Sequence, residues 1–141
     1  MATKKQRELI FNKYGGKCAY CGCELTKGWH IDELEPIRRN KKWDRKKRKW
    51  VYDGTCKHPN RLHIDNQMPA CASCNINKHA MCLEDFRRLV GGFLTSLNRD
   101  STQYKIAKRY GFIQEISKPV VFYFESVKEL AEMDSVPAEL I

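Results

Sequence analysis

The sequence predicts an α+β domain in which short helices and strands share a small core. Three observations point to this fold class. The chain has 141 residues, which suits one modest domain. Apolar residues recur at helical spacing over 83–97, whereas the run at 120–124 has the β-branched and aromatic content of a strand. Two Cys-x-x-Cys pairs, separated by 49 residues, offer a staple for a core of this size.

The N-terminal half begins with one helix and continues with strand-like and turn-rich stretches. We expect a helix over 4–14, which ends at Gly15 and Gly16 because glycine is common just past a helix. Residues 29–37 begin as a strand, and a proline near their end should break regular pairing. Residues 52–66 are rich in turn formers and predict a long loop.

Helices dominate the C-terminal half. They are expected over 75–80, 83–97, 102–110 and about 126–133. Two glycines weaken the second of these helices, and Ser101 can cap the third. No internal repeat or linker is visible, so we expect a single domain over 1–141. Its parts would be a core motif at about 15–82, a basic loop at 38–50 and a C-terminal helix-and-strand extension at about 83–141.

Positive charge is concentrated in one segment. The chain has 26 Lys and Arg against 17 Asp and Glu, a net charge of +9. Nine cations and only one acid fall within 38–50: Arg38, Arg39, Lys41, Lys42, Arg45, Lys46, Lys47, Arg48 and Lys49. This segment could be a solvated, mobile loop. It could also be an arm that grips phosphates, with Trp43 and Trp50 packing on sugar or base. Its high local charge favours the arm and a nucleic-acid partner.

Composition argues against several classes of protein. No apolar stretch approaches the roughly 20 residues that span a bilayer. Residues 1–10 are charged and lack the apolar core of a secretory signal, so we expect a cytoplasmic protein. Seven cysteines cannot all pair within one chain, and cytoplasmic thiols stay reduced. The cysteines therefore favour metal binding over disulfides.

Each Cys-x-x-Cys pair presents two thiolates from one tight turn, which is half of a tetrahedral zinc site. The two pairs together predict one structural Zn²⁺ site with four ligands: Cys18, Cys21, Cys71 and Cys74. Such a site would add directly to folding stability. The competing interpretation is that some of these residues are merely buried thiols. Three further cysteines fit no such spacing: Cys23, Cys56 and Cys82.

Polar residues placed around these pairs carry the functional signal. Asp32 follows the first pair, Asn66 precedes the second, and Asn75 and Lys78 follow it. In this order they resemble the motif of the HNH endonuclease family, most closely the small HNH proteins of phages and bacteria. The resemblance extends past the second pair into the C-terminal segments, so it covers most of the chain.

The resemblance implies a ββα-metal motif, two strands and a helix around one divalent cation, that hydrolyses phosphodiester bonds in DNA by nicking or double-strand cleavage. Asp32 and Asn75 would be oxygen ligands of a catalytic Mg²⁺ or Mn²⁺. Asn66 would tie the loop that holds the catalytic strand. Lys78 would join the basic segment in contacting phosphate. The implied setting is a bacterial cell, with the chain acting as a monomer or homodimer and needing no obligate protein partner.

One position departs from the family motif. Members place a histidine directly after the aspartate as general base, and this chain has Glu33 there. Three explanations stay open. Glu33 is an engineered replacement that disarms the nuclease, or a natural variant that accepts the proton or binds metal, or the mark of a binding module without activity. Glutamate is a weaker base than histidine at neutral pH, so we expect much reduced activity.

The alternative function is that of a non-catalytic zinc-knuckle protein that binds nucleic acid. Such a binder has no need of Asp32, Asn66 and Asn75 at these spacings, whereas a nuclease needs all three. A redox protein built on Cys-x-x-Cys is disfavoured, because the βαβ setting of such motifs is not visible in the sequence.

Overall fold

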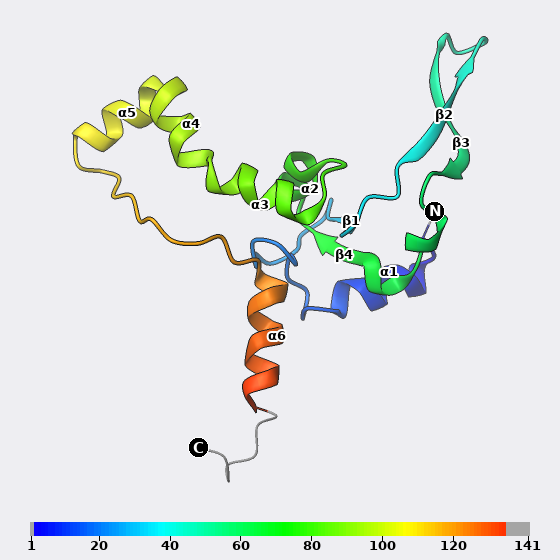
Figure 1. Ribbon diagram of the computed structural model, residues 1–141, viewed down its shortest axis with the longest axis horizontal. Coiled ribbons are helices and arrows are strands. Elements are labelled where there is room, and N and C mark those ends of the chain that lie inside the picture. Colours follow the sequence, from blue (N-terminus) through cyan, green and yellow to red (C-terminus); the bar gives the residue numbers. More distant parts are fainter. Residues whose placement is uncertain (1, 135–141) are drawn as a thin grey trace. The chain divides into compact units, whose positions relative to one another are not determined.

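The computed structural model describes residues 2–134 of the chain (Figure 1). These residues form two compact units, one of 2–82 with 122–134 and one of 83–121. The first unit contains α1 (Lys4–Asn12), β1 (His30–Glu33), β2 (Arg39–Asp44), β3 (Lys49–Cys56), β4 (Gln67–Ala70), α2 (Ala72–Lys78) and α6 (Tyr123–Asp134). The second contains α3 (Leu83–Gly91), α4 (Phe93–Asp100) and α5 (Thr102–Arg109). Helices combined with small two-stranded sheets confirm the α+β class.

Helix α1 starts at a capping box and ends close to the predicted glycines. The Thr3 hydroxyl accepts from the Gln6 amide at 3.2 Å, and the Gln6 side chain accepts from the Thr3 amide at 2.9 Å. These two bonds satisfy donors that a helix start otherwise leaves unpaired. Ile10 points into the core and is fully buried.

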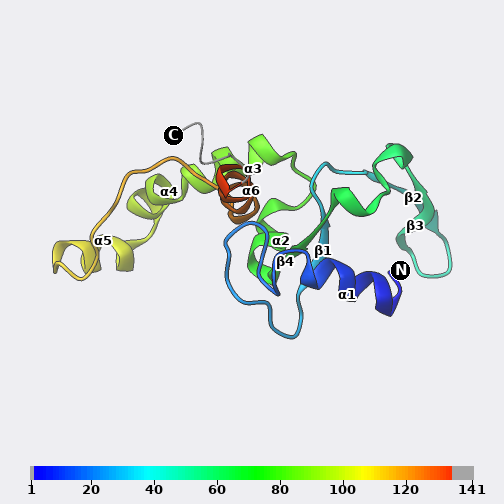
Figure 2. The ribbon, with the colours of Figure 1, turned by 90° about the horizontal axis from the view of Figure 1, so that it is seen from below.

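Strands β1 and β4 form an antiparallel pair that leads directly into α2. The register runs from His30 opposite Ala70 to Glu33 opposite Gln67. Figures 1 and 2 show β1, β4 and α2 side by side. The sequence did not predict β4, because it is only four residues long and contains Pro69. A proline is tolerated here because β4 is an edge strand.

A β-hairpin of β2 and β3 spans 39–56, which includes most of the basic loop predicted over 38–50 and the first part of the loop predicted over 52–66. The two strands pair antiparallel, with Trp43 opposite Trp50 and Lys41 opposite Tyr52. Charged side chains line both strands, so no apolar alternation marked them as strands in the sequence. The prediction of a basic loop is therefore wrong in structure, although the charge lies where it was expected.

The aromatic run at 120–124 is not a strand, contrary to the prediction. Its backbone bonds to the first cysteine turn, since the amides of Tyr123 and Phe124 donate to the carbonyls of Tyr20 and Ala19, each at 2.9 Å. Phe122 packs edge-on against Tyr20, with ring centroids 5.6 Å apart. The chain then turns into α6, so the expected extension of 83–141 is divided between the two units.

The second unit is helical, as its apolar spacing predicted. Gly92 separates α3 from α4 within the single helix expected over 83–97. Ser101 caps α5 by accepting from the Tyr104 amide at 3.2 Å. Glu115 joins α4 to α5, because it accepts hydrogen bonds from Asn98, Tyr104 and Lys108. Among the described residues, no helix is long and apolar enough to cross a membrane.

Candidate functional site

Four cysteine sulfurs from two distant segments meet in the first unit. The Sγ atoms of Cys18, Cys21, Cys71 and Cys74 all lie within 4.8 Å of one another, and those of Cys21 and Cys71 are 3.8 Å apart. A tetrahedral Zn²⁺ ion with Zn–S bonds of about 2.3 Å places its sulfurs about 3.8 Å apart. The cluster could therefore hold a metal such as zinc, with the four ligands that the sequence predicted.

A tight turn over 18–23, which we call the knuckle, presents the first cysteine pair. The Cys18 amide donates to the Cys23 carbonyl at 2.8 Å, and the Gly22 amide donates to the Cys18 carbonyl at 3.0 Å. Gly22 has a φ of +76°, and a Cβ at this position would lie 3.0 Å from the ring of Tyr123. Glycine is thus required both for the left-handed turn and for the close approach of α6.

The second pair lies at the start of α2. Cys71 is the N-cap residue, and its sulfur accepts from the Cys74 amide at 3.4 Å. A hydrogen bond between the Cys74 and Cys18 side chains lowers the pKa of Cys18 to about 4 and raises the pKa of Cys74. Cysteine binds metal as the thiolate, and the lowered pKa of Cys18 favours that form at its sulfur. Metal binding would release the protons of the other thiols.

Asp32 is buried on β1, with only 5% of its surface exposed. The Tyr20 hydroxyl donates to Asp32 Oδ2, and Lys78 Nζ lies 3.0 Å from the same oxygen. Burial raises the pKa of Asp32 above its usual range, while Lys78 and Tyr20 offset part of that rise. Burial and the nearby carboxylate also raise the pKa of Tyr20, so this hydroxyl keeps its proton and acts as a donor.

Lys78 is fully buried at the end of α2, although the sequence predicted a surface contact with phosphate. Its Nζ pairs with Asp32 and also donates to the Glu33 carbonyl at 2.9 Å. These two bonds attach α2 to β1. A phosphate could reach this ammonium group only after the ion pair with Asp32 opened.

Asn66 ties the segment after β1 to the segment before β4. Its Oδ1 accepts from the Glu35 amide at 2.9 Å, and its Nδ2 donates to the carbonyls of Glu35 at 2.9 Å and Arg61 at 3.1 Å. The backbone carbonyl of Asn66 accepts from the Leu34 amide at 2.8 Å. The side chain is buried, so these bonds hold the end of β1 in place.

Asn75 lies in α2 one turn before Lys78. Residues three apart share one face of a helix, and Lys78 faces Asp32 on β1. Asn75 is half-buried. The two oxygen ligands expected from the sequence, Asp32 and Asn75, therefore come from facing elements.

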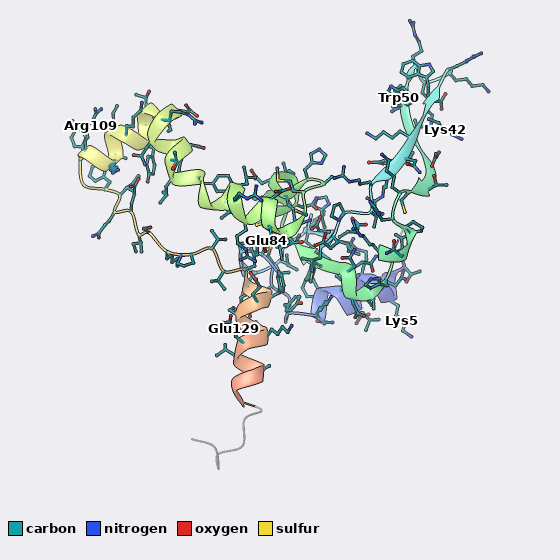
Figure 3. All side chains as sticks on the ribbon, in the orientation of Figure 1. Lys5, Lys42, Trp50, Glu84, Arg109 and Glu129 are labelled. Atoms are coloured by element: carbon teal, nitrogen blue, oxygen red, sulfur yellow. The ribbon has the colours of Figure 1, made fainter. Side chains whose placement is uncertain are left out.

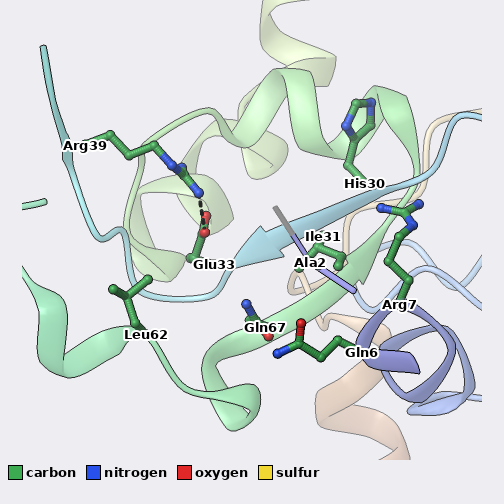
Figure 4. A pocket seen from close by; sticks show the side chains of 9 residues that line it. All are labelled: Ala2, Gln6, Arg7, His30, Ile31, Glu33, Arg39, Leu62 and Gln67. Carbon is green, nitrogen blue, oxygen red and sulfur yellow. Dashed lines mark hydrogen bonds and ion pairs between the residues drawn. The ribbon is translucent and has the colours of Figure 1, made fainter. Parts of the chain in front are cut away.

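Glu33 lies on the face of β1 opposite Asp32, because successive side chains of a strand alternate. Its carboxylate pairs with Arg39 at 2.7 Å, where β2 begins. A pocket of about 470 Å³ opens on this side, and Figure 4 shows its lining. The lining residues are Ala2, Gln6, Arg7, His30, Ile31, Glu33, Arg39, Leu62 and Gln67. The pocket is thus polar, with Arg39 paired to Glu33 and Arg7 near His30.

The cations predicted to bind nucleic acid lie on the β2–β3 hairpin and just before it. All nine between 38 and 49 are exposed, in contrast to the buried Lys78. Figure 3 labels Lys42 and Trp50 on this hairpin. The rings of Trp43 and Trp50 meet nearly at right angles, with centroids 5.7 Å apart. Positive charge and exposed aromatic surface therefore coincide.

Tyr20 is a site residue that sequence reasoning missed. It lies between the first two cysteines, so the knuckle that presents the sulfurs also brings its hydroxyl to Asp32. The signal was its aromatic ring at a position flanked by two metal-ligand candidates. The contact itself depends on how β1 packs against the knuckle.

No protein-family model, curated protein or solved structure matches the chain.

Proposed function

We propose that this chain is a metal-dependent endonuclease of the HNH type that hydrolyses phosphodiester bonds in DNA and is weakened by Glu33. One observation carries the proposal. An antiparallel strand pair leads into a helix, a four-cysteine cluster lies at the start of that helix, and Asp32 faces the helix from the first strand. This order of elements and residues supports the proposal because it resembles that of the ββα-metal motif.

Four residues of the chain would have distinct roles in the reaction. Asp32 and Asn75 offer oxygen donors, which Mg²⁺ and Mn²⁺ prefer. When bound, such a cation would stabilise the charge that develops on the scissile phosphate and its leaving oxygen. Glu33 would accept a proton from the attacking water. Asn66 would keep the end of β1 in position through its bonds to Glu35 and Arg61.

The side-chain oxygens of Asp32 and Asn75 suit a divalent cation, but one oxygen of Asp32 is already engaged. Asp32 Oδ2 already accepts from Tyr20 and pairs with Lys78. Cation binding at Asp32 would therefore displace the ammonium group or use the other carboxylate oxygen. Either route predicts that Mg²⁺ and Mn²⁺ bind more weakly here than they would at an unpaired aspartate.

A second candidate function is a non-catalytic zinc-knuckle protein that binds nucleic acid. The observation in its favour is that both acidic groups of the site are engaged. Glu33 pairs with Arg39, Asp32 pairs with Lys78, and the two carboxylates are on opposite faces of β1. The four-cysteine cluster and the exposed cations would serve a binder equally well.

Plasmid relaxation in the presence of Mg²⁺ or Mn²⁺ separates the two functions. We would compare this chain with Glu33→His, and use Glu35→His as the matched control, because it makes the same charge change at an exposed position two residues away. Nicking by Glu33→His alone supports the site assignment and makes Glu33 a disabling residue. Nicking by the unaltered chain as well makes Glu33 a working base.

If neither protein cuts, while both bind DNA and carry zinc, the endonuclease proposal fails and the binding function replaces it. Zinc content and DNA binding are therefore measured on the same samples. Asp32→Asn added to Glu33→His should abolish any nicking, because it removes the charged ligand of the cation.

A further inference from the structure

One face of the β2–β3 hairpin gathers three aromatic side chains. Its register places Lys41 opposite Tyr52 and Trp43 opposite Trp50, and these four side chains lie on the same face because strand residues alternate. We name this the aromatic face. Contacts within it agree with the register, since Lys41 Nζ lies 5.6 Å from the centre of the Tyr52 ring.

The rings of the aromatic face are unusually exposed. Trp43 is 51% exposed, Trp50 63% and Tyr52 62%. The two indoles touch one another nearly at right angles, so each still offers ring surface to a ligand. Large aromatic side chains are normally buried, and grouped exposed rings mark interaction surfaces.

The turn between the strands presents four consecutive cations. Arg45, Lys46, Lys47 and Arg48 are all exposed. Asp44 orders this turn, because its Oδ1 accepts from the Lys46 amide at 2.9 Å and the Lys47 amide at 3.1 Å. Arg48 has a φ of +50°, a conformation that glycine adopts at lower cost. The turn thus keeps a cation where a glycine would fit the backbone better.

These features together identify the chemistry of a ligand. Clustered cations favour a polyanion, and exposed aromatic rings favour ligands with flat groups that can stack on them. Single-stranded nucleic acid supplies both, because its bases are free to stack on aromatic side chains while its phosphates contact lysine and arginine. In a duplex the bases stack on each other and show only their edges in the grooves.

We propose that the β2–β3 hairpin binds unpaired nucleotides of DNA, with bases on the aromatic face and phosphates on the cations of the turn. The choice of DNA rests on the proposed function. This inference refines the substrate class, since a nuclease with such a hairpin would engage DNA that contains unpaired bases next to the site of cleavage.

Fluorescence anisotropy with labelled DNA tests the proposal on the full chain loaded with zinc. The probes are an oligothymidylate and a blunt duplex of the same length. We expect the single strand to bind at least about 10-fold more tightly than the duplex. Trp50→Ala should weaken single-strand binding by about 10-fold, and Trp50→Phe should recover most of it, because phenylalanine retains a ring that can stack.

The salt dependence of binding separates stacking from charge. Trp50→Ala should leave the slope of log affinity against log salt unchanged, because the indole does not neutralise a phosphate. Lys46→Gln with Lys47→Gln should make that slope shallower by about 0.7 for each phosphate that the two lysines neutralise. Tyr110→Ala is the matched control, since Tyr110 belongs to an exposed aromatic pair outside the hairpin and should not affect affinity.

Two results would overturn the proposal: a duplex that binds as tightly as the single strand, or a Trp50→Ala variant with unaltered single-strand affinity. Equal binding of heparin and oligothymidylate, both unaffected by Trp50→Ala, would show a surface that recognises charge alone. Plasmid nicking by the same samples keeps the outcomes distinct. If the chain cleaves DNA but Trp50→Ala leaves single-strand affinity unchanged, only the hairpin proposal fails. If Trp50→Ala weakens binding but no variant cleaves DNA, only the endonuclease proposal fails.

Discussion

Replacing Lys78 with methionine tests whether the buried ion pair holds the helix of the site against its strand. The Lys78 side chain is fully buried, and the side chain of Asp32 is 7% exposed. Methionine fills a similar volume but leaves the Asp32 carboxylate buried with no cation beside it. Breaking one side of a buried pair costs about 3–5 kcal/mol. The free energy of unfolding of a small domain is about 5–15 kcal/mol, so this cost would be a large part of the total.

The assay is urea unfolding of the zinc-loaded chain at neutral pH, followed by circular dichroism. A double-mutant cycle with Asp32→Asn isolates the pair. Asparagine still accepts the hydrogen bond from Tyr20 but carries no charge. Lys78→Met with Asp32→Asn should therefore cost less than Lys78→Met alone, because no unpaired charge remains in the buried site.

Lys42→Met is the matched control, since Lys42 is an exposed lysine of the hairpin and its replacement should change stability by no more than about 0.5 kcal/mol. A Lys78→Met variant within about 1 kcal/mol of the unaltered chain would refute the reasoning. So would a double variant whose cost equals the sum of the two single costs, because the two residues would then act independently.

Three further predictions concern the four-cysteine cluster, the turn at Gly22 and the second unit. Removal of zinc by a chelator should lower the unfolding temperature sharply, and Co²⁺ should restore it with the absorption of a tetrahedral thiolate site; one metal ion per chain by elemental analysis is the companion measurement. Gly22→Ala should destabilise the first unit by at least about 1 kcal/mol, as judged by urea unfolding, because alanine is strained at φ +76° and meets the Tyr123 ring. Bonds from Asn98, Tyr104 and Lys108 lower the pKa of Glu115, so its stabilising effect should be present above the usual glutamate pKa of 4.5 and disappear as the pH falls through the lower folded value. Amide exchange in α4 and α5, compared with Glu115→Gln, should show a difference at neutral pH that vanishes in acid.

Local signals in the sequence were enough to locate several parts of the structure. Helices α1 and α5 could be predicted from neighbouring residues: Gly15 and Gly16 follow the first, and Ser101 caps the second by accepting from an amide three residues on. The four-cysteine cluster could be predicted because each half is a short turn with its own spacing. A role of Asn66 as a tie was implied by the family resemblance; in the structure, two of its side-chain hydrogen bonds join Glu35, just after β1, and the third joins Arg61.

Other parts depended on contacts between residues far apart in the chain. Strands β2 and β3 were missed because both faces of the hairpin meet solvent, so no apolar side had to alternate with a polar one. The run at 120–124 has strand-like composition, but the backbone of Tyr123 and Phe124 bonds to the cysteine knuckle instead of a partner strand. Composition cannot distinguish these outcomes, because β-branched and aromatic content does not show which backbone groups a segment will bond to.

The sequence by itself determined the two Cys-x-x-Cys pairs, the concentration of positive charge and most of the helical segments, since each depends on residues within a few positions of one another. Only the tertiary structure decided which cations pair with Asp32 and Glu33. Lys78 and Asp32 are 46 residues apart, and nothing in their local sequence shows that the ammonium group is buried against the carboxylate. Burial makes such a charge costly to leave unpaired, and packing alone brings the partner that lowers this cost.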